Sequence, residues 1–263
     1  MKKGISFVII VLLLVLSFFY VKYENENVVA IIGAMDCEIS ELGAAVKGLN
    51  VQKHSDFTVL KGKIGKYNVV VTKSGVGKVN AGSTAQYIID KYNPKYIVNI
   101  GLAGSLDKGA YQGDILVANK MVQHDFDISA FGYAKGYMST GKDKHKPTVY
   151  YADTQLSQIF KKKLEANKNI KHVYEGMIAT GDCFVSSAKN KGSIKEYFGA
   201  NAVDMESAAI AQVAQKNNIP VVIIKNISDT KNDDAEEYAK KEDFYGKELA
   251  KTVSKMLESD KRF

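Results

Sequence analysis

Apolar runs alternate with segments of helical spacing along most of the chain. Val28 to Ile32 form a continuous apolar run that stops at Gly33, and residues 38–47 then carry apolar side chains at helical intervals. Further strands are expected at residues 57–64, 67–72, 96–100, 114–122, 202–203 and 221–227. Further helices are expected at 79–92, 154–167, 188–198 and 244–257, and another begins near Glu206. This alternation predicts an α/β fold, a three-layer αβα domain with a central mixed, mostly parallel sheet.

Two carboxylates stand where the pattern predicts the ends of buried strands. Glu206 follows the short apolar run 202–203 and opens an Ala-rich helical pattern, and Asp229 ends the apolar run that begins at Val221. Taken singly, Glu206 is explained as an acid at a helix N-terminus and Asp229 as a turn residue. Ligands of open α/β sheets bind at the carboxyl ends of strands, so the two acids together favour a binding site.

Three other strand ends combine small residues with a polar one, at residues 33–38, 74–77 and 101–105. Small residues let the backbone approach a ligand closely. Neither a dinucleotide fingerprint, nor a Gly-Lys-Ser/Thr step, nor a Gly-x-Ser-x-Gly elbow is present in the sequence. His124 to Asp127 resemble half a metal site, but the chain has four histidines and none at a matching spacing. We therefore expect neither a cofactor nor a metal.

The N-terminus has a different pattern. Lys2 and Lys3 precede an apolar run from Gly4 to Val21, which is typical of an export signal. Residues 18–21 offer no small residues for cleavage, and about 18 apolar residues are near the minimum that spans a bilayer, so an uncleaved anchor is the alternative. We expect residues 1–23 to be a signal peptide or membrane anchor and residues 24–263 to be one folded domain. The protein would then be exported, in a periplasm or at the cell surface.

Composition adds little to the choice of partner. The formal net charge is +7, and lysines cluster at residues 142–146 and 161–163, where they are most often solvated. On an exported domain these lysines could contact anionic polysaccharide. No aromatic-interleaved basic stripe is present, which disfavours nucleic acid. The two cysteines, Cys37 and Cys183, are expected to be free, buried thiols.

Seven segments, taken in order, resemble those of the 5'-methylthioadenosine/S-adenosylhomocysteine nucleosidases of the purine nucleoside phosphorylase superfamily. They are IIGAMDCEISEL, SGVGKVNAG, NIGLAGSL, QHDFDISAFGY, TGDCFVSS, VDMESAAIAQVA and IKNISD. The resemblance implies hydrolysis of the N-glycosidic bond of an adenine nucleoside thioether, with 5'-deoxyadenosine as a further candidate substrate. It also implies a homodimer in which Phe131 and its neighbours close the partner's pocket.

The resemblance also assigns roles to residues. It implies that Glu38 activates water, that Glu206 holds the ribose hydroxyls and that Asp229 protonates N7 of the leaving adenine. Further substrate contacts are implied for Ala34, Met35, Ser74, Phe184, Val185, Met205 and Ser228. Adenine leaves poorly as an anion, so Asp229 must carry a proton, and we expect apolar surroundings that favour the protonated form.

Two alternatives compete with the hydrolase. A purine nucleoside phosphorylase needs a side chain that binds phosphate, normally an arginine. Arg262 is the one arginine in the chain, although lysine could substitute. A surface-displayed basic protein that binds anionic polysaccharide is the second alternative. The sequence also departs from the family, because Asp204 replaces a glutamate and residues 240–244 lack the first aromatic of the lid. Tyr238 is a candidate replacement, which leaves the preferred 5' group open.

Overall fold

The computed structural model describes residues 28–139, 141–229 and 235–259. The expected signal or anchor at residues 1–23 therefore lies outside the described residues, as does Arg262. Among the described helices, none combines the length and the apolar character needed to span a bilayer.

Ten strands form one mixed sheet in the described residues, in the order β10-β6-β8-β9-β5-β1-β4-β3-β2, with β7 paired to β6. The strands are β1 (Val28–Gly33), β2 (Lys47–His54), β3 (Phe57–Ile64), β4 (Tyr67–Lys73), β5 (Tyr96–Ser105), β6 (Ile115–Gln123), β7 (Tyr150–Tyr151), β8 (Val173–Thr180), β9 (Ala202–Asp204) and β10 (Val221–Asp229). β5 is central, because it pairs in parallel with β1 and β10 and antiparallel with β9. The strand ends that hold the candidate residues therefore meet beside β5.

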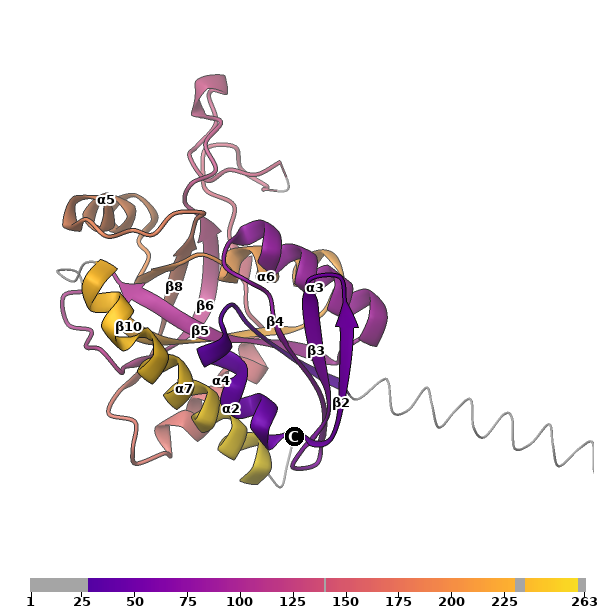
Figure 1. Ribbon diagram of the computed structural model, residues 1–263. Coiled ribbons are helices and arrows are strands. Elements are labelled where there is room, and N and C mark those ends of the chain that lie inside the picture. Colours follow the sequence, from indigo (N-terminus) through magenta and orange to yellow (C-terminus); the bar gives the residue numbers. More distant parts are fainter. Residues whose placement is uncertain (1–27, 140, 230–234, 260–263) are drawn as a thin grey trace, which may run out of the picture.

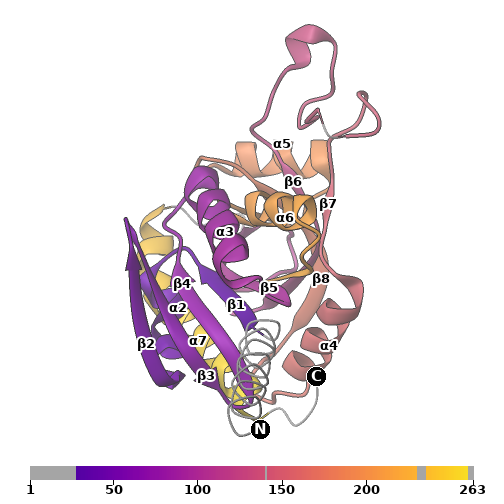
Figure 2. The same ribbon diagram turned by 90° about the vertical axis from the view of Figure 1, so that its right-hand side faces the viewer.

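Helices cover both faces of this sheet (Figure 1). They are α2 (Asp36–Ala45), α3 (Lys78–Tyr92), α4 (Thr154–Glu165), α5 (Ala188–Phe198), α6 (Ser207–Lys216) and α7 (Ala235–Ser259). Side chains of a strand alternate between faces, so Ala30 and Ile32 pack in the core beneath α3 and α6, while Val29 and Ile31 pack in the core beneath α2, α4 and α7. Figure 2 shows α3 and α6 lying side by side on their face. The predicted three-layer αβα fold is confirmed.

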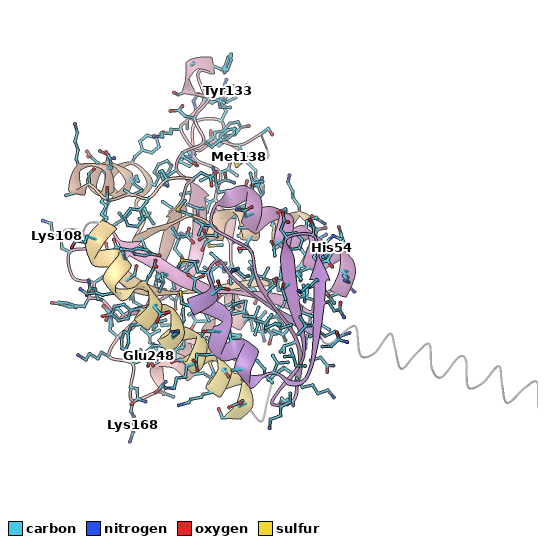
Figure 3. The ribbon with its side chains drawn as sticks, viewed as in Figure 1. His54, Lys108, Tyr133, Met138, Lys168 and Glu248 are labelled. Carbon is cyan, nitrogen blue, oxygen red and sulfur yellow. The ribbon has the colours of Figure 1, made fainter. Side chains whose placement is uncertain are left out.

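A long excursion leaves the body of the domain between β6 and β7 (Figure 3). Apart from one 3-10 turn at Ser129–Phe131, its described part is turns and irregular chain. The rings of Tyr133 and Tyr137 stack at 5.1 Å, and Ala134 N–H donates to Lys144 O, so its two arms are tied together. Figure 3 places Tyr133 towards its tip and Met138 nearer the body.

Three expectations about elements were incomplete or wrong. The pattern predicts no strand at β2 or β8, because β2 is exposed along nearly its whole length and has no apolar run to reveal it. The helix expected to continue to residue 47 ends at Ala45, and Val46 is already extended. Helical spacing predicts Val79 on the apolar side of the helix over residues 79–92, but its side chain is 81% exposed.

Candidate active site

One cavity lies at the carboxyl ends of β1, β5, β9 and β10. Its walls come from distant parts of the chain: Ala34, Met35, Glu38, Val76, Leu102, Ala103, Gly104, Cys183, Phe184, Val185, Val203, Asp204, Met205, Glu206, Ser228, Asp229 and Tyr238. The structure thus brings Glu38, Glu206 and Asp229 to one cavity, together with most of the predicted substrate contacts. Ser74 is the exception. It is buried beside the cavity without lining it, and its hydroxyl donates to Gly75 O at 2.8 Å.

Glu38 is held by backbone N–H groups at the start of α2. Its Oε2 accepts from Ala34 N at 2.5 Å and Met35 N at 3.0 Å, and its Oε1 accepts from Leu102 N at 3.0 Å. Burial raises the pKa of this carboxyl, while the Lys225 ammonium and the three N–H donors lower it. The net shift is upward. The group is therefore a buried, oriented carboxyl with a raised affinity for a proton, which suits a general base.

Glu206 caps α6 and connects the two halves of the chain. Its Oε1 accepts from Gly77 N at 2.9 Å, across 129 positions of sequence. Burial raises the pKa of Glu206 to about 7, against Lys225, and the charges of Asp204 and Glu38 add to the increase. Its ionisation therefore changes near neutral pH.

Lys225 is a buried cation that sequence analysis missed. Its Nζ lies 3.1 Å from Asp204 Oδ2, and both side chains are 1% exposed. Burial lowers the pKa of Lys225, but Asp204, Glu206 and Glu38 together outweigh burial and raise it. Lys225 therefore stays charged and offsets part of the repulsion among the carboxylates. A lysine inside the apolar run of β10 was the signal that could have revealed it.

Asp204 is fixed by its own polar contacts. Oδ1 accepts from Thr180 Oγ1 at 2.6 Å, and Oδ2 accepts from Ser207 N at 3.0 Å and from Ser207 Oγ at 2.5 Å. With Lys225 also bound, both carboxylate oxygens of Asp204 are engaged by other groups of the protein. Asp204 therefore anchors Lys225 and the start of α6.

Asp229 is buried, but its immediate surroundings differ from the expected apolar ones. Its Oδ1 accepts from Ser228 Oγ at 2.9 Å, and its Oδ2 accepts from Lys191 Nζ at 2.6 Å. Lys191, on α5, is buried itself, and its side chain is 0% exposed. The sequence pattern of α5 gave no sign of this buried lysine. The expected burial of Asp229 at the end of β10 is observed, but a buried ammonium and a hydroxyl contact its carboxyl group.

Aromatic and sulfur groups form the rest of the wall. The rings of Phe184 and Tyr238 meet edge to face at 5.2 Å, and the Tyr238 hydroxyl lies 3.9 Å from Met35 Sδ. Burial raises the pKa of Tyr238, so the phenol stays neutral. Both cysteines are free, as predicted, but Cys183 is exposed and Cys37 only half-buried, so the prediction of two buried thiols was wrong.

The segment from His124 to Asp127 forms no metal site with its neighbours. Among the described residues there is no group of three or more histidine, cysteine or carboxylate side chains that could hold a metal ion. Asp125 instead pairs with Lys78 Nζ at 2.6 Å and accepts from Asp182 N at 2.8 Å. Because Lys78 is the first residue of α3, these contacts fix the start of that helix to the segments that contain Asp125 and Asp182.

Comparison with known proteins assigns this chain to a family. Residues 28–258 match the model of the phosphorylase superfamily. The chain is 36% identical over 232 residues to the 5'-methylthioadenosine/S-adenosylhomocysteine nucleosidase of Staphylococcus haemolyticus, an alignment that covers 88% of this chain and 97% of the relative. It is 40% identical over 203 residues to the nucleosidase of Buchnera aphidicola, covering 77% and 78%. The chain belongs to the 5'-methylthioadenosine/S-adenosylhomocysteine nucleosidase family.

Solved structures agree with this assignment. The nucleosidase of Neisseria meningitidis in complex with methylthio-immucillin-A superposes with a TM-score of 0.81 at 30% identity, covering 89% of this chain and 100% of that one. The nucleosidase of Colwellia psychrerythraea in complex with adenine gives 0.79 at 31% identity, covering 88% and 95%. The family predicted from the seven segments is therefore confirmed for the nucleosidase domain.

Proposed function

We propose that the protein hydrolyses the N-glycosidic bond of 5'-methylthioadenosine and S-adenosylhomocysteine, releasing adenine and the 5'-thioribose sugar. The convergence of Glu38, Glu206 and Asp229 on one cavity carries this proposal. The named relatives are nucleosidases for these two compounds, which supports the choice of substrate. 5'-Deoxyadenosine is a third candidate, because it keeps the adenine and ribose and lacks only the thioether.

Each carboxyl group has its own step. Asp229 delivers a proton to N7 as the bond to adenine breaks, so that the base does not leave as an anion. Glu206 accepts hydrogen bonds from the ribose hydroxyls. Glu38 takes a proton from the attacking water, and the negative charges of Glu38 and Glu206 stabilise the oxocarbenium-like sugar.

The remaining walls suit an adenine nucleoside thioether. Phe184 offers a ring for stacking on the base, Val185 offers backbone hydrogen-bonding groups, and Met205, Ala34 and Ser228 lie at the cavity wall. Ser74, behind the wall, positions the 74–77 turn. Met35 and Tyr238 lie together on the side of the aromatic pair, and we assign the 5' substituent to them.

Hydrolysis is favoured over phosphorolysis by the charge of the cavity. Among the described residues, those lining it include four carboxylates, Glu38, Asp204, Glu206 and Asp229, but no lysine or arginine that could hold phosphate. The nearby Lys225 is bound by Asp204. Adenine release should therefore proceed at the same rate with and without inorganic phosphate.

An anionic co-substrate would meet these four acids, and the two buried lysines beside them, Lys225 and Lys191, are already paired with Asp204 and Asp229. Water carries no such penalty, and the cavity's charge therefore suits water as the nucleophile.

The direct test is adenine release from 5'-methylthioadenosine by the wild type and by Asp229→Asn. Asparagine keeps the shape of the side chain but cannot deliver the proton, so the rate should fall about 10²–10⁴-fold. Equal rates for the two proteins would remove Asp229 from the mechanism. No release by either protein would favour the alternative in which the domain only binds ligands.

We further propose export of the protein and retention at a membrane through residues 1–23, on the pattern of Lys2, Lys3 and the apolar run that follows. A homodimer is proposed from the family resemblance and from exposed apolar side chains, since Val79 and Phe131 are each at least 80% exposed. Binding of anionic polysaccharide stays a prediction from the basic composition. Lys161, in one of the two lysine clusters, is already paired with Glu175 at 2.8 Å.

A further inference from the structure

Lys191 is the buried lysine on α5 whose ammonium contacts the proposed general acid. Burying an ammonium is costly unless it is paired, and Lys191 Nζ lies 2.6 Å from Asp229 Oδ2. On the same helix Lys189 is exposed and Lys195 is partly exposed, paired with Asp107. The fold therefore buries one particular lysine of this helix against the one carboxyl group that must provide a proton.

This contact has a consequence for the chemistry. A carboxylate that accepts a hydrogen bond from an ammonium is ionised, and the second oxygen of Asp229 accepts from Ser228 Oγ at 2.9 Å. In this state Asp229 has no proton to give to N7. The proton closest to it is on Lys191.

Two other charged groups of the described residues, Asp107 and Lys225, are bound elsewhere. Asp107, after β5, is bound by Lys195, and Lys225, on β10, is bound by Asp204. β5 contributes Gly104, where an added Cβ would lie 2.8 Å from Asp229 Oδ2, so this strand brings only backbone against the carboxyl group. In the described residues, Lys191 is thus the cation that faces Asp229.

We propose that Lys191 supplies the proton that Asp229 passes to adenine, a step that rests on the proposed function. As the glycosidic bond breaks, its electron pair moves onto the base, and N7 takes the proton of the Asp229 carboxyl group. The Lys191 ammonium transfers one proton to that carboxyl group and becomes a neutral amine. Glu38 gains a proton from the attacking water, and exchange with solvent returns that proton to the medium and a proton to Lys191. Lys191 is therefore a positioning residue that acts through Asp229.

Substitution of Lys191 by arginine distinguishes a lysine that supplies a proton from one that only forms an ion pair with Asp229. The guanidinium of Lys191→Arg keeps the positive charge and can still donate hydrogen bonds to Asp229, but it does not give up its proton in proteins. Lys191→Met removes both the charge and the proton while keeping an unbranched side chain for the buried space. Lys195→Met makes the same change four positions along α5, away from Asp229, and serves as the matched control.

The first measurement is steady-state adenine release from 5'-methylthioadenosine. We expect kcat to fall at least about 100-fold for both Lys191→Met and Lys191→Arg, with KM changed only a few-fold, and Lys195→Met to match the wild type. For Lys191→Met, Asp229 must take its proton from solvent, so the ratio of its kcat to that of the wild type should rise as the pH falls from 8 to 5.

The second measurement uses a substrate that needs no acid. The 4-nitrophenyl 5-methylthio-β-riboside loses 4-nitrophenolate, which leaves without protonation, so both Lys191 variants should release it at rates close to the wild type. Thermal unfolding of each variant reports whether it is folded, and the nitrophenyl substrate reports whether its sugar site is intact.

Three results would overturn the proposal. A Lys191→Arg enzyme as fast as the wild type on 5'-methylthioadenosine would show that the ion pair only holds Asp229 in place. Equal losses on the nitrophenyl substrate would assign Lys191 a purely structural role. A Lys191→Met enzyme with the same pH profile as the wild type would show that the proton comes from another source. A wild type that releases no adenine would instead contradict the proposed function itself.

Discussion

At the scale of single residues, the site is a set of acids whose proton affinities are set by burial and by one shared cation. Burial raises the pKa of Glu38 and of Glu206, and the charge of Lys225 opposes both shifts. Lys225 is held in turn by Asp204. Removing this lysine would leave acids buried without their counter-charge, which is costly.

The ionisation of Glu206 predicts the pH dependence of substrate capture. Burial raises the pKa of Glu206 to about 7, so the group is protonated below neutral pH and ionised above it. A carboxylate accepts hydrogen bonds from ribose hydroxyls better than a carboxylic acid does. We expect kcat/KM for 5'-methylthioadenosine to rise with pH through an inflection near 7, and we expect Glu206→Gln to lack that inflection. An inflection unchanged in Glu206→Gln would assign it to another group.

The same shift predicts the opposite trend for stability. The folded protein holds the Glu206 proton up to about pH 7, whereas an unfolded glutamate loses it near 4.5. The folded state therefore binds more protons between these values, and the free energy of unfolding decreases as pH rises through this window. The shift corresponds to at most about 3 kcal/mol. Chemical denaturation from pH 4 to pH 8 should show Glu206→Gln gaining stability relative to the wild type as pH rises; a constant difference would contradict this.

Sequence analysis found the acids more readily than the lysines that pair with them. Glu206 and Asp229 each follow an apolar run, so the pattern itself places them at strand ends. On α5, Lys189, Lys191 and Lys195 look alike in the sequence, and only the packing of the helix on the end of the sheet decides which one is buried. A pairing between residues 38 positions apart, such as that of Lys191 and Asp229, depends on tertiary structure.

At the scale of elements, β5 makes room for the acids by having glycine where other strands carry side chains. An added Cβ at Gly101 would lie 2.7 Å from Glu38 Oε1 and 2.9 Å from Lys225 Nζ. One at Gly104 would lie 2.8 Å from Asp229 Oδ2. In both cases the atoms that must move are the functional ends of side chains, so the strand can stay folded while the site is distorted.

Alanine at these glycines should therefore impair catalysis more than folding. We expect Gly101→Ala and Gly104→Ala to reduce kcat/KM for 5'-methylthioadenosine by about 10²-fold or more, since misplacement by about 1 Å has effects of that order. Gly109→Ala is the matched control, because an added Cβ there meets no atom within 4 Å. Adenine release and thermal unfolding, measured side by side, test this. Full activity in both β5 variants would show that the acids tolerate the displacement.

The elements that the sequence predicted are those with a buried apolar face. β1, β5 and β10 are buried throughout and appear as apolar runs. β2 was missed because hydrogen bonds to β3 define it and its side chains remain exposed. Val79 is exposed although helical spacing predicts it on the apolar side of α3, because spacing cannot show which part of a helix extends beyond the sheet.

At the scale of the whole molecule, the site exists only when the two halves of the chain are packed together. Glu38 and the Gly77 N–H come from the first half, and Glu206, which accepts from Gly77, comes from the second. Leu102, on the central strand, supplies an N–H to Glu38. Activity should therefore be lost together with the global fold, in a single transition.

The N-terminal segment is expected to set location and not catalysis. Every described residue that lines the cavity lies between positions 34 and 238, and the sheet begins at Val28. We expect a protein lacking residues 1–23 to release adenine with the same kcat and KM as the full chain. On fractionation, the full chain should be found with the membranes if the segment is retained as an anchor, and the truncated protein should be in the soluble fraction. A truncated protein that unfolds at the same temperature but releases adenine more slowly would contradict this, because the segment would then have to contribute to the site.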